Sequence, residues 1–97
     1  MRFRFSRQAE SDIEEIGDFI ARDNPARAVS YIQELRARCR QLAGFPEAAP
    51  ARKALGEDVR MVVFGRYLIL YVVHQDVLEI RRVVHGAREL TGDDPLD

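Results

Sequence analysis

Cationic side chains gather at one place where the sequence predicts a strand rather than a helix. Arg81, Arg82, His85 and Arg88 lie in and just after the apolar segment 77–85, and Arg60 lies one position into another such segment. Guanidinium groups bind phosphates and carboxylates through paired hydrogen bonds, and imidazole exchanges a proton near neutral pH. These five residues are therefore the candidate binding or catalytic set.

Side-chain alternation along the last segment predicts how this set is oriented. With Leu78, Ile80 and Val84 facing the core, Arg81 and His85 would share the other face of the strand. Together with Arg60 they could hold a phosphate and supply an acid or base, or they could hold a partner's carboxylates. A charged, solvated face is the third interpretation. No spacing in the sequence is typical of a metal site, a phosphate-binding glycine loop or a nucleophile elbow.

Four strands are expected to carry these residues. Arg2–Phe5 alternates arginine and phenylalanine, and the segments Val59–Phe64, Tyr67–His74 and Val77–His85 form a predicted meander broken at Gly65 and at Gln75-Asp76. The run 67–73 is apolar at every position, so we expect that strand to be covered on both faces and central. The residues 45–58 are predicted to be a loop.

Two helices lie between the first strand and the loop. The first is predicted from Arg7 to Asp23 with Ser6 as its N-cap, and the second from Pro25 to Ala43 with Asn24 as its N-cap. Each has an apolar stripe, and the short break predicts an antiparallel hairpin. The stripe of the first helix consists of Ala9, Ile13, Ile16 and Ile20, and that of the second consists of Ala28, Ile32, Leu35, Cys39 and Leu42. The other face of the first helix is acidic and is expected to point outward; its residues are Glu10, Asp12, Glu14, Glu15 and Asp18.

This order predicts an α+β domain, β-α-α-β-β-β, with the hairpin on one face of an antiparallel sheet. The 97 residues form one domain, with an acidic tail over roughly 90–97. The net charge of −1 argues against autonomous binding of duplex DNA. The single cysteine excludes an internal disulfide, and the lack of a signal-peptide core or a membrane span leads us to expect a cytoplasmic protein. Because no metal-ligand spacing or phosphate-binding glycine loop is present, we expect no cofactor.

Several short motifs in a fixed order resemble the RelE/ParE superfamily of bacterial type II toxins. They are A-E-S-D-I-E-E-I at 9–16, N-P-A-R-A at 24–28, F-P at 45–46, L-G-E-D-V-R at 55–60, Y-L-I-L-Y at 67–71 and I-R-R-V-V-H-G-A-R-E at 80–89. The resemblance covers nearly the whole chain and implies the same β-α-α-β-β-β fold. The last motif is most similar to the ParE branch.

The ParE resemblance implies a toxin that inhibits DNA gyrase by binding and that a cognate ParD-like antitoxin neutralises in a hetero-oligomer. Arg60, Arg81, Arg82, His85 and Arg88 would then contact gyrase or the antitoxin, with the acidic helix face as a second docking surface. RelE-type toxins instead cleave mRNA on the ribosome with several basic residues and a tyrosine or histidine near the C-terminus. Here Lys53 is the only lysine, and no aromatic or imidazole group follows His85.

Two alternatives follow from that comparison. In a ribosome-dependent endoribonuclease, Arg60 and Arg81 would stabilise the phosphate and His85 would act as acid or base. In a non-toxic binding module, the same residues would only pair with an antitoxin-like protein. The missing basic set favours a protein that is not an enzyme.

Overall fold

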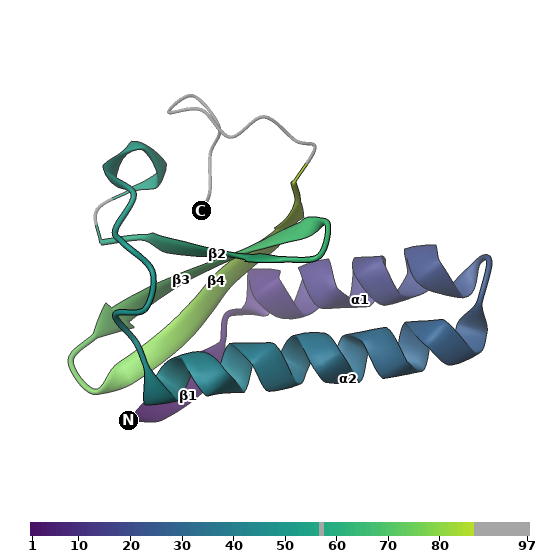
Figure 1. Ribbon diagram of the computed structural model, residues 1–97, viewed down its shortest axis with the longest axis horizontal. Coiled ribbons are helices and arrows are strands. Elements are labelled where there is room, and N and C mark those ends of the chain that lie inside the picture. Colours follow the sequence, from purple (N-terminus) through teal and green to yellow (C-terminus); the bar gives the residue numbers. More distant parts are fainter. Residues whose placement is uncertain (57, 87–97) are drawn as a thin grey trace.

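The computed structural model describes residues 1–56 and 58–86 and contains one strand, two helices and then three strands (Figure 1). The α+β class and the β-α-α-β-β-β order predicted from the sequence are confirmed. The elements are β1 (Arg2–Phe5), α1 (Arg7–Ala21), α2 (Pro25–Gln41), β2 (Arg60–Phe64), β3 (Tyr67–His74) and β4 (Val77–His85), with short 3₁₀ turns at Leu42–Gly44 and Lys53–Leu55.

The two helices begin where capping residues were predicted. The Ser6 hydroxyl accepts from the Ala9 backbone N–H at 3.0 Å, and the Asn24 side chain accepts from the Arg27 backbone N–H at the same distance. Each cap satisfies a donor that the first helical turn cannot pair internally. The helices run antiparallel along one face of the sheet (Figure 1). Both end about two residues earlier than predicted.

The four strands form one sheet in the order β1-β4-β3-β2. The apolar strand β3 is in the interior of the sheet, as its composition predicted, and it pairs antiparallel with β2 and β4. β1 pairs parallel with β4, because the hairpin of helices returns the chain to the opposite edge before the meander begins. Within the described residues, no helix is long and apolar enough to cross a bilayer.

The core lies between the helices and the sheet. The apolar stripes of both helices pack on inward-facing residues of β3 and β4, and Tyr71, Leu35 and Ile80 are fully buried there. The Tyr71 hydroxyl donates to the Pro46 carbonyl at 2.9 Å, which satisfies its polar end inside the core. Cys39 is buried as predicted, and burial raises the pKa of its thiol to about 12. It is therefore a core residue and not a nucleophile.

One irregularity in the sheet changes which side chains of β4 face the helices. Leu70 lies opposite Arg82, but the next residue, Tyr71, lies opposite Ile80, so Arg81 is an extra residue in β4. Such a β-bulge shifts the alternation of side chains beyond it by one position. Accordingly Leu78 and Ile80 face the core before the bulge, whereas Val83 and not Val84 joins the core cluster after it.

Candidate partner-binding site

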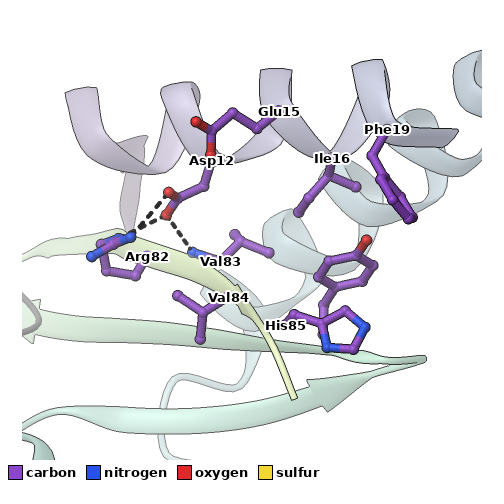
Figure 2. Close-up of a pocket in the computed structure, with 9 residues that line it drawn as sticks. Asp12, Glu15, Ile16, Phe19, Arg82, Val83, Val84 and His85 are labelled. Atoms are coloured by element: carbon purple, nitrogen blue, oxygen red, sulfur yellow. Dashed lines mark hydrogen bonds and ion pairs between the residues drawn. The ribbon is translucent and has the colours of Figure 1, made fainter. Parts of the chain in front are cut away.

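A groove of about 300 Å³ lies between α1 and the second half of β4 (Figure 2). Its floor is apolar, and Phe19 at its mouth is 61% exposed, so it adds apolar surface to the rim. Charged and polar groups stand along its edges. The lining residues are Asp12, Glu15, Ile16, Phe19, Tyr67, Arg82, Val83, Val84 and His85.

The groove exists because β1 is too short to cover the whole of β4. β1 ends at Phe5, opposite Ile80, so the outer edge of β4 has no neighbouring strand from Arg81 onward. The start of α1 satisfies that edge instead. The Ser6 backbone N–H donates to the Ile80 carbonyl at 2.9 Å, and its hydroxyl donates to the Arg81 carbonyl at 2.8 Å.

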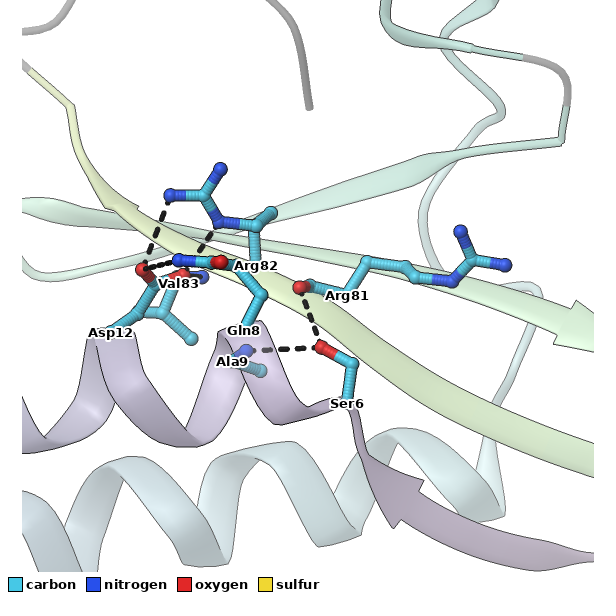
Figure 3. A network of polar contacts seen from close by, with 7 residues as sticks. All are labelled: Ser6, Gln8, Ala9, Asp12, Arg81, Arg82 and Val83. Carbon is cyan, nitrogen blue, oxygen red and sulfur yellow. Dashed lines mark hydrogen bonds and ion pairs between the residues drawn. The ribbon is translucent and has the colours of Figure 1, made fainter. Parts of the chain in front are cut away.

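Asp12 satisfies the next position on this edge (Figure 3). Its carboxylate accepts from the Val83 backbone N–H at 2.9 Å and from two guanidinium nitrogens of Arg82 at 2.8 and 3.1 Å. Asp12 is only 5% exposed, so this charge is compensated almost entirely by those three donors and a weaker contact from Gln8. The hydrogen bond to Asp12 raises the pKa of Arg82, which stays charged. α1 is thereby fixed to the bulged strand.

His85 forms the far wall of the groove. It lies opposite Tyr67 in the β3–β4 pairing, and the two rings meet edge to face with centroids 5.3 Å apart. Tyr67 belongs to the core cluster, so His85 is on the helix side of the sheet. Figure 2 shows its imidazole at the end of the groove beyond Val83.

The structure does not bring Arg60, Arg81 and His85 together. The prediction that Arg81 and His85 share a face is wrong, because the bulge at Arg81 reverses the alternation between them. Arg81 forms an ion pair with Glu79 on the other face, away from the groove. Arg60 lies opposite Tyr71, where its guanidinium donates to the Ala49 carbonyl of the preceding loop.

Of the remaining predicted residues, Arg82 and His85 line the groove, and Arg88 lies outside the described residues. Asp12, expected on the exposed acidic face, is buried, and sequence reasoning missed its role. A signal for it was present: Asp12 follows Ala9 by three residues and precedes Ile16 by four, so it belongs to the apolar stripe. An aspartate in such a stripe predicts a buried partner. In the described ranges, no group of acidic, histidine or cysteine side chains could hold a metal ion.

Comparison with known proteins agrees with this architecture. Residues 3–90 match the family model described as ParE toxin of type II toxin-antitoxin system, parDE. A solved structure described as a chromosomal ParDE TA system from P. aeruginosa superposes with a TM-score of 0.78 at 18% identity, covering 88% of this chain and 95% of that chain. At that identity the likeness shows the fold. No curated protein matches the chain.

The fold and the family match define a toxin of a type II toxin–antitoxin system. Within that class, the chain belongs to the ParE family, the toxins of parDE systems. Membership in a toxin–antitoxin family implies a cognate antitoxin as partner.

Proposed function

We propose that this ParE-family chain inhibits DNA gyrase by binding it, without chemistry of its own, and that a ParD-like antitoxin neutralises it in a cytoplasmic hetero-oligomer. The family match supports the toxin role. The observation that carries the choice of binding over catalysis is the separation of Arg60, Arg81 and His85 onto different parts of the sheet.

Phosphodiester cleavage needs cationic groups and a proton-transfer group around one phosphate. Here Arg82, the cation nearest to His85 along the groove, gives two nitrogens to the buried carboxylate of Asp12. Arg60 is engaged by a backbone carbonyl near Tyr71. Among the residues lining the groove, Arg82 is thus the only source of a guanidinium, and Asp12 already engages two of its nitrogens.

The same groove is well suited to an antitoxin segment. An apolar floor with Ile16 and Val83, and Phe19 at the mouth, can receive an apolar anchor side chain, and Glu15 at the edge can pair with a basic residue. The groove also lies between the two docking surfaces expected from the sequence, the acidic face of α1 and the cationic end of β4. We therefore place the antitoxin's anchoring contact in this groove.

Two measurements test the proposal. The chain is expressed alone under tight induction while pulse-labelled DNA synthesis and protein synthesis are followed in parallel. A fall in DNA synthesis first supports gyrase inhibition. If protein synthesis falls first, the gyrase proposal is wrong, and a His85→Ala variant then tests the endoribonuclease alternative. If neither falls while folded chain is present, the chain is a binding module.

The antitoxin contact is tested with a matched pair of substitutions. Phe19→Ser changes the groove, whereas Val29→Ser changes a residue of α2 that is equally exposed, at 62%, and lies outside the groove. We expect Phe19→Ser to weaken binding of the cognate antitoxin about a hundredfold, the effect of truncating an aromatic residue that carries much of the binding energy, and Val29→Ser to change it little. Equal effects of the two substitutions would show that the groove is not the docking site.

A further inference from the structure

The outer face of the sheet, the face turned away from the helices, has a charged cluster that the groove does not include. It consists of Arg4 from β1 and Glu79 and Arg81 from β4. Arg4 lies opposite Glu79 in the parallel β1–β4 pairing, and Arg81 is the bulge residue two positions later. Leu78 and Ile80 face the core on either side of Glu79, so all three side chains of the cluster lie on the outer face.

Glu79 holds the two arginines in a particular way. Arg4 Nε donates to one carboxylate oxygen at 2.9 Å, and Arg81 Nε lies 2.5 Å from the other. Each guanidinium is thus held by its Nε, and within residues 1–56 and 58–86 neither has a further acceptor for its terminal Nη groups. The Glu79 side chain is 15% exposed, whereas those of Arg4 and Arg81 are 67% and 50% exposed. The carboxylate is therefore largely shielded from solvent, whereas the two arginine side chains are exposed to solvent.

A hollow of about 280 Å³ adjoins the cluster, with Val72 and Val77 as its apolar part and His74 at its far end. Arginine side chains lose conformational entropy when a ligand fixes them, and Glu79 has already restricted both. The cluster carries two positive charges and one negative charge, and so has one net positive charge. That charge and the paired Nη donors complement a single carboxylate, with the aliphatic stem of its side chain on the valines.

We propose that the Arg4–Glu79–Arg81 cluster binds a glutamate or aspartate side chain of an acidic peptide segment in a partner protein. A nucleic acid strand fits less well, because a backbone phosphodiester has no aliphatic stem of its own to lie on Val72 and Val77. This site shares no lining residue with the groove, so the proposal does not depend on whether the antitoxin docks in the groove.

The test follows the Nε–Hε cross-peaks of Arg4 and Arg81 in ¹H–¹⁵N NMR spectra of the full chain. The probe is a capped hexaglutamate peptide, and the comparison probes are inorganic phosphate and a hexathymidylate oligonucleotide. We expect both cross-peaks to shift saturably with hexaglutamate and less with either comparison probe. An Arg81→Gln or Arg4→Gln chain should bind the peptide about tenfold more weakly, because each loses one charge-assisted contact.

Arg40→Gln is the matched control, since Arg40 is an exposed arginine of α2 far along the chain from the cluster. It should bind hexaglutamate as the unmodified chain does. An unchanged affinity in both cluster variants, an equal loss in Arg40→Gln, or the absence of saturable shifts would overturn the proposal. Tighter binding of the oligonucleotide or of phosphate than of hexaglutamate would overturn its ligand class. The amide spectrum of each variant reports that it remains folded.

Discussion

The buried contact between Asp12 and β4 leads to the most demanding prediction. Replacing Asp12 with alanine removes the acceptor for the Val83 N–H and for two nitrogens of Arg82, whose side chain is only 14% exposed. Removing one member of a buried ion pair typically costs about 3–5 kcal/mol, because the other charge stays buried without compensation. Arg82 can turn partly toward solvent, so we expect about 3 kcal/mol for Asp12→Ala.

Urea unfolding followed by circular dichroism measures this loss. With a slope of about 1 kcal/mol per molar, the midpoint should fall by about 3 M. Asp12→Asn keeps an acceptor but loses the charge, so it should cost about half as much. Glu14→Ala removes an exposed acid from the same helix and should change stability by no more than about 0.5 kcal/mol.

A double replacement, Asp12→Leu with Arg82→Met, separates the ion pair from simple packing. Because it removes both charges together, it should be more stable than Asp12→Ala by about 1 kcal/mol or more. If Asp12→Ala costs less than about 1 kcal/mol, the ion pair does not hold α1 on β4. The same follows if the double replacement costs as much as Asp12→Leu and Arg82→Met made singly and added together.

Three further predictions concern the cap, the thiol and the buried phenol. Ser6→Ala loses its bonds to the Ala9 N–H and the Arg81 carbonyl and should cost about 2 kcal/mol in the same urea assay, whereas Ser11→Ala on the exposed side of α1 should be near neutral. Burial raises the pKa of the Cys39 thiol to about 12, so at pH 8 the native chain should not react with a thiol reagent that labels the urea-unfolded chain within minutes; fast native labelling would contradict the burial. Burial also raises the pKa of Tyr71, so the native state keeps a proton that the unfolded state releases above about pH 10. Stability should therefore fall as pH rises past 10, and this fall should be smaller in Tyr71→Phe, which at neutral pH costs about 1 kcal/mol for the bond to Pro46.

The regular elements could be predicted from the sequence because their causes are local. Ser6 and Asn24 cap the helices they precede, and the apolar run from Tyr67 to Val73 fits a strand covered on both faces. The position of Cys39 in a helical stripe was enough to predict its burial. In each case the residues that determine the structure are neighbours in the sequence.

The site could not be predicted in the same way, because its geometry depends on contacts between distant residues. Side-chain alternation is reliable only while a strand is regular, and the bulge at Arg81 interrupts it. That bulge is supported by Asp12, whose hydrogen bond to the Val83 N–H spans 71 residues of sequence. Arg60 is similarly engaged by Ala49, a loop residue whose path the composition did not determine. The bulge, which long-range contacts accompany, therefore decides whether His85 faces the groove or the outer face.

The place of β4 in the sheet also determines when this protein can fold during its synthesis. β4 is the last described strand in the chain, yet it lies between β1, the first, and β3. Until the ribosome has extruded residues 77–85, β1 has no partner and α1 lacks the strand that Asp12 binds. Pairing between segments as far apart in the sequence as β1 and β4 also closes a long loop and is slow to form. A nascent chain that lacks β4 therefore has neither the complete sheet nor the groove, so native structure forms only after residues 77–85 have been synthesised.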